Sequence, residues 1–185
     1  MNNISQYLPI DRRLALDKGE SLPRQAHGAV LFADVSGFTP LTAAYANALG
    51  ARQGAEELIR QINAVYTALI NEIRQCGGCV IYFGGDSITC WFNEDNGQRA
   101  ATCALAMQRS MTAFTAIATP IQKTVSLSIK IAIAVGSVRR FALGDPNITK
   151  IDAMVGSTLN RMATAAKLAT AGELVVSQEV VQQKQ

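Results

Sequence analysis

The sequence contains few charged residues, few aromatic residues and a single histidine. Lys, Arg, Asp and Glu make up 17% of its 185 residues, and Phe, Trp and Tyr make up 6%. The net charge is only +3 and the basic residues are dispersed, which argues against a nucleic-acid-binding protein. No apolar run is long enough to span a membrane, and the N-terminus lacks the pattern of a signal peptide. These absences predict a cytoplasmic domain with no nucleic acid partner and no membrane span.

The four cysteines lie in apolar surroundings or beside glycines, which predicts reduced thiols in the absence of a signal peptide. Cys76-Gly77-Gly78-Cys79 has C-x-x-C spacing, but it stands alone, short of the four ligands of a structural zinc site. We interpret its two glycines as the end of a helix. The lone His27 has no companion histidine and is expected at the surface.

Hydrophobic residues form 49% of the sequence, which is enough for one domain with a sizeable core. We expect an N-terminal extension at residues 1–27, with a short helix at Asp11–Lys18. One domain is expected from residue 28 to residue 185. The end of the chain agrees with a piece cut from a longer polypeptide.

The stretch G-A-V-L-F-A-D-V-S-G-F-T organises the first part of this domain. Ala29–Ala33 reads as a buried strand that ends on Asp34. A helix follows, for which Thr39 is the expected N-cap and Pro40 the first helical residue. A carboxylate beside a helix N-terminus can hold a divalent cation and phosphate groups together.

Hydrophobic periodicity predicts the rest of the elements. The first helix is followed by a second that continues to about residue 74, after interruptions at Gly50 and Gly54, with an apolar stripe interpreted as core packing. Asp86 is expected at the tip of a hairpin, and Gly136 is expected to end a strand. The other expected elements are strands at 80–83, 87–92, 126–135, 138–143, 150–155 and 173–176, helices at 98–114 and 156–169, and a turn at 144–147.

This order predicts an α+β fold with a ferredoxin-like βαββαβ core and a mostly antiparallel sheet with helices packed on one face. In that arrangement the end of the first strand lies beside the tip of the hairpin. Asp34 and Asp86 would therefore converge, and two converging carboxylates can form a two-metal site for phosphoryl chemistry.

Five motifs stand in order along the chain: F-A-D-V-S-G-F-T, G-G-x-V-x-x-x-G-G-D-S-I, K-I-A-I-A-V-G, F-x-x-G-D and V-G-S-T-L-N. Together they resemble the class III nucleotidyl cyclases, most of all the soluble, bicarbonate-responsive adenylyl cyclase type. The resemblance covers about residues 7–176. It implies conversion of ATP to cyclic AMP and pyrophosphate with two Mg²⁺ or Mn²⁺ ions. The implied metal ligands are Asp34, Asp86 and the backbone carbonyl of Val35. The implied nucleotide contacts are Ser36, Gly37, Phe38, Thr39, Gly85 and Lys130, and Asn160 is an implied catalytic residue.

The same resemblance shows departures at three positions. Tyr82 stands where active homodimeric relatives have a base-reading lysine, and Ala153 stands where they have Asp or Thr, with Asp152 displaced by one. Thr164 replaces an arginine that stabilises the reacting phosphate, a loss that typically costs several kcal/mol of barrier. The neighbouring Arg161 is poorly placed to substitute.

The metal-binding half of the site is therefore complete and the other half is not. We expect the chain to act as a homodimer or as a pseudo-heterodimer with a second cyclase half, and to be weak or inactive alone. Bicarbonate activation is not expected, because Tyr82 and Ala163 occupy the positions of its basic anchors. Two alternatives stay open. One is a catalytically degenerate regulatory or nucleotide-binding module. The other is a polymerase-like palm, although this sequence lacks the Glu-Phe expected after Asp86 in such a palm. The choice between ATP and GTP is also open.

Overall fold

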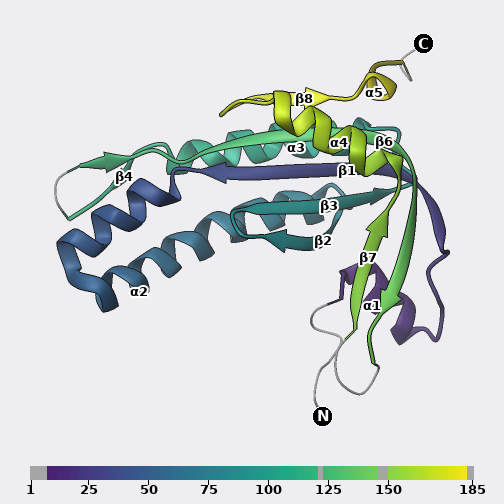
Figure 1. Ribbon diagram of the computed structural model, residues 1–185, viewed down its shortest axis with the longest axis horizontal. Coiled ribbons are helices and arrows are strands. Elements are labelled where there is room, and N and C mark those ends of the chain that lie inside the picture. The colour runs from purple at the N-terminus through teal and green to yellow at the C-terminus, as the bar shows by residue number, and fades with distance from the viewer. Residues whose placement is uncertain (1–7, 121–122, 146–149, 183–185) are drawn as a thin grey trace.

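Two long strands, β1 (Gln25–Ser36) and β6 (Ser128–Leu143), pair along their length at the centre of a six-stranded sheet (Figure 1). The computed structural model describes residues 8–120, 123–145 and 150–182. The other strands of this sheet are β2 (Cys79–Gly84), β3 (Ser87–Asn93), β7 (Ile151–Val155) and β8 (Leu174–Val176). Their order is β2-β3-β1-β6-β7, and β8 also pairs with β6. Only the β6–β8 pairing is parallel, so the predicted mostly antiparallel α+β sheet is confirmed.

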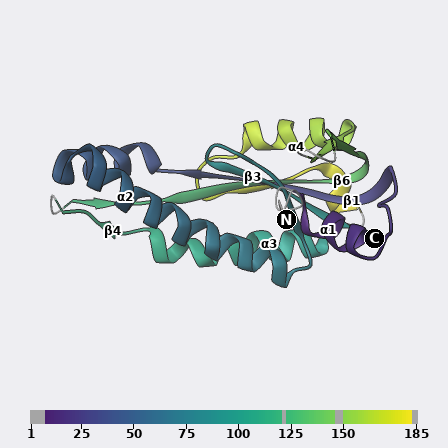
Figure 2. The same cartoon turned by 90° about the horizontal axis from the view of Figure 1, so that it is seen from below.

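Helices cover both faces of this sheet (Figure 2). The first face carries α2 (Phe38–Gln75) and α3 (Gln98–Ser110), and the second carries α4 (Ser157–Leu168). The prediction that all helices share one face is therefore wrong for α4. Its Met162 and Ala165 join a cluster with Val30 and Ala134, because the central strands are apolar on both faces and each face must be covered. The smaller elements are α1 (Ile10–Asp17), the 3-10 turn η2 (Met111–Phe114), β4 (Ile117–Ala118), β5 (Thr124–Val125) and α5 (Gln178–Gln182).

The long helix α2 bends where the sequence predicts an interruption. Gly50 has φ of 77°, outside the helical range, and separates a short N-terminal arm from the long C-terminal part. Gly54 does not interrupt the helix, contrary to expectation. A Cβ atom there would lie 2.8 Å from the carbonyl of Tyr45, so glycine allows the two parts of the bend to touch. The predicted stripe packs inward, except that Ile59 is 56% exposed.

Strand β6 runs without a break through Gly136, so the prediction of two separate strands is wrong. Gly136 lies opposite Gly28 of β1, and the pairing of β1 with β6 continues on both sides. Gly136 has φ of 154°, which residues with a side chain rarely adopt, and a Cβ atom there would also lie 2.7 Å from the Thr158 hydroxyl. Residues 146–149 of the predicted turn lie outside the described residues.

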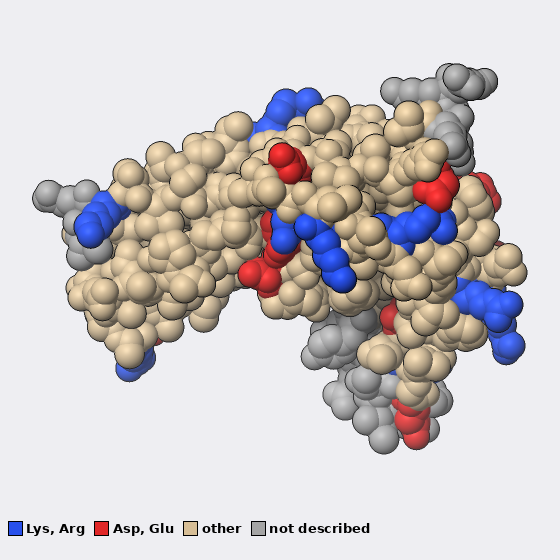
Figure 3. Space-filling view, turned by 45° about the horizontal axis from the view of Figure 1, so that its top comes forward, with Lys and Arg blue, Asp and Glu red and all other residues tan. Residues whose placement is uncertain are grey.

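Other predictions hold closely. The short N-terminal helix is α1, Gly77 forms the turn after α2 with φ of 70°, and His27 is exposed. The face in Figure 3 carries small groups of acidic and basic side chains separated by wide uncharged surface. Within the described ranges, no helix is both long and apolar enough to cross a membrane.

Candidate functional site

Strand pairing brings Asp34 and Asp86 together. Asp34 lies opposite Ser87, the first residue of β3, so the tip of the β2–β3 hairpin is beside the end of β1. The amide of Val35 donates a hydrogen bond to the carbonyl of Asp86, with 3.0 Å between nitrogen and oxygen. Asp34 is half-buried and Asp86 is exposed. The two acids named from the sequence are thus neighbours in the fold.

Tyr66 of α2 lies against the same hairpin tip. Its hydroxyl donates to the carbonyl of Gly85 over 3.2 Å, and its ring meets that of Phe83 edge to face, with 5.6 Å between centroids. Burial raises the pKa of the Tyr66 phenol, and the negative charges of Asp86 and Asp34 raise it further. The pKa of this one phenol therefore depends on the charges of both carboxylates. The sequence showed Tyr66 only as one member of the apolar stripe, because its contacts with the hairpin are not local.

The start of α2 lies directly after β1 and supplies backbone donors. Gly37, with φ of 106°, is the N-cap residue, and no side chain caps this helix. The prediction of Thr39 as the cap is wrong, because the helix begins at Phe38, two residues before the expected Pro40, and Thr39 is already in its first turn. A Cβ atom on Gly37 would lie 2.5 Å from the carbonyl of Ser126, so only glycine fits. The first amides of a helix have no partner within it and can bind anions.

Lys130 contacts Asp34 rather than open solvent. It lies directly opposite Asp34 in the pairing of β1 with β6, and its Nζ is 3.0 Å from Asp34 Oδ2. Both side chains are partly buried, at 34% and 23% exposure. The expected contact of Lys130 with a terminal phosphate stays a prediction. In the chain alone, this lysine neutralises one of the two neighbouring carboxylates.

This pair leads to a prediction for metal binding. Replacement of Lys130 by methionine removes a cation that competes with a metal ion for Asp34. Free Mn²⁺ should then bind about two- to fivefold more tightly, the range expected from a partly exposed ion pair. The measurement is a titration with Mn²⁺ followed by EPR, with Lys167→Met on α4 as the control. Equal affinities for Lys130→Met and the wild-type chain would show that the ion pair does not compete.

Asn160 and Thr164 lie at the surface of α4, one helical turn apart, and the Thr164 hydroxyl donates to the Asn160 carbonyl over 3.0 Å. Among the described residues, neither one makes a hydrogen bond or ion pair with Asp34 or Asp86. Arg161 is turned onto its own chain. Its Nη2 donates to the carbonyl of Val135 over 2.9 Å, and its Nε lies 3.0 Å from Glu179. The guanidinium of Arg161 is therefore already engaged.

Tyr82, at the position expected to read the base, lines a cavity of about 890 Å³ between α1, the end of α2, β2 and β7. Its side chain is 47% exposed. Asp152, displaced by one from the second base-reading position, also borders this cavity. Ala153 presents no polar side chain at all.

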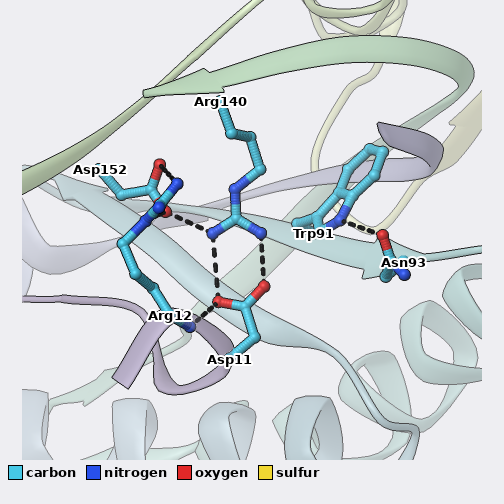
Figure 4. A network of polar contacts seen from close by, with 6 residues as sticks. All are labelled: Asp11, Arg12, Trp91, Asn93, Arg140 and Asp152. Atoms are coloured by element: carbon cyan, nitrogen blue, oxygen red, sulfur yellow. Dashed lines mark hydrogen bonds and ion pairs between the residues drawn. The ribbon is translucent and has the colours of Figure 1, made fainter. Parts of the chain in front are cut away.

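Asp152 is held in a buried network of charges that the sequence did not reveal (Figure 4). Arg12 of α1 donates to Asp152 over 2.8 Å, and Arg140 of β6 bonds to both Asp152 and Asp11. The Asp152 side chain is fully buried, and that of Arg140 is 3% exposed. These partners are 12 to 140 residues apart, so no local pattern predicts them. The network joins α1 to the sheet and engages both oxygens of Asp152, the acid next to Ala153.

Asp11 shows the electrostatic consequence of this arrangement. Burial alone raises the pKa of its carboxyl, but the hydrogen bond and charge of Arg140 outweigh burial, and the pKa is lowered overall. Burial likewise opposes the charge of Arg140, yet its bonds to Asp11 and Asp152 raise its pKa. Asp11 and Arg140 therefore each hold the other in its charged form.

The donors near Asp34 suit a hard divalent cation. Two carboxylates and the carbonyl of Val35 are oxygen ligands of the kind that Mg²⁺ and Mn²⁺ prefer. Strand pairing places Asp34 opposite Ser87, and the Val35 amide bonds the Asp86 carbonyl, so the two acids are neighbours in the fold. In the part of the chain that the structure describes, no group of three or more His, Cys, Asp or Glu residues forms a metal site. A metal here would rest on two side chains and a backbone carbonyl.

Comparison with known proteins identifies the family of the chain. The pattern of the adenylate and guanylate cyclase catalytic domain matches residues 22–185. The chain is 22% identical over 151 residues to adenylate cyclase type 10 of Homo sapiens and of Rattus norvegicus, which is 81% of this chain but only 9% of those proteins.

Solved structures show the same fold at low identity. A bacterial light-regulated adenylyl cyclase superposes with a TM-score of 0.72 and 19% identity, over 97% of this chain and 52% of that one. A dimeric guanylyl cyclase domain from the aquatic fungus Blastocladiella emersonii gives a TM-score of 0.66 and 16% identity, over 86% and 84% of the two chains. Because the family pattern matches residues 22–185, the chain belongs to the adenylate and guanylate cyclase catalytic domain family.

Proposed function

We propose that this chain is the metal-binding half of a nucleotidyl cyclase that converts ATP to cyclic AMP and pyrophosphate. The observation that carries the proposal is the convergence of Asp34 and Asp86 beside the N-terminus of α2. Two mutually repelling carboxylates have no structural need to converge, and a divalent cation between them removes the repulsion.

The residues of the chain have distinct roles in this proposal. Asp34, Asp86 and the Val35 carbonyl would hold two Mg²⁺ or Mn²⁺ ions. Bound divalent ions lower the pKa of an attacking hydroxyl and hold phosphate oxygens. The first amides of α2 and the residues at 36–39 would bind the triphosphate, and Lys130 would leave Asp34 to bind its terminal phosphate.

The missing functions would come from a second cyclase half. The surface of α4 offers Asn160 and Thr164 but no free guanidinium, since Arg161 is bonded to Val135 and Glu179. Tyr82 and Ala153 offer no charge to read a base. A related guanylyl cyclase domain is dimeric, and a homodimer or pseudo-heterodimer would place a second chain across this site.

The test is complementation between two versions of this chain. The second version carries Asp34→Asn, Tyr82→Lys and Thr164→Arg, so it lacks the metal site but gains the missing groups. With Mn²⁺ and either ATP or GTP, each version alone should be inactive. Their mixture should produce cyclic nucleotide at least about 100-fold faster, the typical effect of one charge-stabilising group.

The other outcomes are equally informative. Turnover by the wild-type chain alone at the rate of the mixture would refute the need for a second half. A preference for GTP would refute the proposed substrate. Binding of Mn²⁺ and nucleotide without turnover in any combination would favour a regulatory, nucleotide-binding module. The ion pair of Lys130 with Asp34 supports that alternative, because it neutralises a carboxylate without a metal.

A further inference from the structure

The hairpin tip that carries Asp86 is built from residues that do not hold a fixed conformation by themselves. It contains two consecutive glycines, and Gly85 has φ of 66°. Residues 82–86 are all exposed, and nothing lies within 4 Å of the place where a Cβ atom of Gly85 would be. Glycine loses more conformational freedom on ordering than any other residue. A carboxylate on such a tip needs outside contacts to stay in one place.

Within the hairpin, the Ser87 hydroxyl donates to the Gly84 carbonyl over 2.9 Å, and two contacts from outside the hairpin hold the tip, one from each side. On the β1 side, the amide of Val35 donates to the carbonyl of Asp86. On the α2 side, the hydroxyl of Tyr66 donates to the carbonyl of Gly85, and the Tyr66 ring packs edge to face on Phe83. The first contact belongs to the sheet. The second comes from a helix about 20 residues earlier and is the only side-chain hydrogen bond that α2 makes to the tip among the described residues.

From this arrangement we propose that Tyr66 positions Asp86 for metal binding: its hydroxyl fixes the Gly85 carbonyl and thereby holds the neighbouring carboxylate beside Asp34. The inference rests on the proposed metal-binding role of Asp34 and Asp86. Tyr66 is a positioning residue, since its hydroxyl bonds to the backbone of the tip and its ring packs on Phe83. A pre-ordered ligand does not have to lose freedom when the ion binds, so affinity rises without a new metal contact.

The experiment measures Mn²⁺ binding to the whole chain by EPR of free Mn²⁺, together with the midpoint of thermal unfolding. Tyr66→Phe keeps the ring contact with Phe83 and removes only the hydroxyl. We expect its Mn²⁺ affinity to fall about three- to tenfold, the range for one lost hydrogen bond, with little change in the midpoint. Tyr66→Leu, which also loses the ring contact, should bind more weakly still. Tyr45→Phe removes a hydroxyl from the other end of the same helix and should bind Mn²⁺ as the wild-type chain does.

A hydroxyl with a purely structural role would lower the unfolding midpoint and leave the affinity of the folded protein unchanged, and that result overturns the inference. Wild-type affinity in Tyr66→Phe, while Asp34→Asn is impaired, overturns it as well and leaves the metal site in place. Wild-type affinity in Asp34→Asn overturns the metal site, and the inference falls with it. Reduced affinity in Tyr66→Phe with an unchanged midpoint, and no effect in Tyr45→Phe, supports it.

Discussion

Asp34→Asn is expected to weaken Mn²⁺ binding by about 100-fold or more and to abolish cyclic nucleotide production by the complemented pair. Asparagine keeps the shape of the side chain and removes its charge, so the strand pairing of β1 with β3 and β6 should survive. Changes to groups that merely support metal ligands already cost 10- to 100-fold, and a direct ligand should cost at least as much. Binding is measured by EPR of free Mn²⁺, and turnover by product formation from ATP.

The control for this substitution is Asp17→Asn, which removes an exposed carboxylate from the end of α1. It should leave Mn²⁺ binding unchanged. Asp86→Asn should match Asp34→Asn if both carboxylates hold the same ions. If Asp34→Asn bound Mn²⁺ as tightly as the wild-type chain, the convergence of the two acids would have no role in metal binding.

Arg140→Met is expected to lower the free energy of unfolding by about 3–5 kcal/mol, the usual result of removing one partner from a buried ion pair. Arg140 is 3% exposed and bonds to both Asp11 and Asp152. Without it, the fully buried Asp152 keeps only Arg12 as a partner. The measurement is equilibrium unfolding in urea at neutral pH.

The adjacent Arg139→Met provides a matched control. Arg139 lies on the same strand with its side chain exposed, and its loss should change stability by about 0.5 kcal/mol or less. A loss below about 1 kcal/mol for Arg140→Met would contradict the expectation that the variant leaves buried carboxylate charge uncompensated. Such a result would mean that Asp152 finds another partner or water.

The fold could be predicted from the sequence because its main signals are local. The alternation of strand side chains is one such signal, and in β3 it places Ile88 and Cys90 on one face and Trp91 on the other. The order of strands and helices then led to the sheet that places Asp34 beside Asp86. The position of α4 could not be predicted in this way, because a small-residue helix packs equally well on either face of a sheet that is apolar on both.

The parts of the site that were missed depend on contacts between distant residues. Tyr66 and Gly85 are 19 residues apart, and Arg12 and Asp152 are 140 apart. A tyrosine in an apolar stripe gives no sign that its hydroxyl reaches a hairpin. An arginine in a short N-terminal helix likewise gives no sign that it is buried. The cap of α2 was missed for a different reason: Gly37 is chosen by its positive φ and by close approach to Ser126, and Thr39 offered the more familiar pattern.

Strand β6 runs unbroken between two charged side chains that lie in distant parts of the molecule, so the number of residues between them decides which face each one occupies. Lys130 at one end pairs with Asp34, and Arg140 at the other joins the buried network. The even-numbered residues between them face α4, whereas the odd-numbered Ile131 and Ile133 face α2 and α3. Because strand side chains alternate, loss or gain of one residue between these ends would turn one of the two charges into the opposite, apolar layer. An insertion or deletion of two residues would keep both charges on their present face, so the distance between Lys130 and Arg140 along the strand can change without loss of either contact only in steps of two residues.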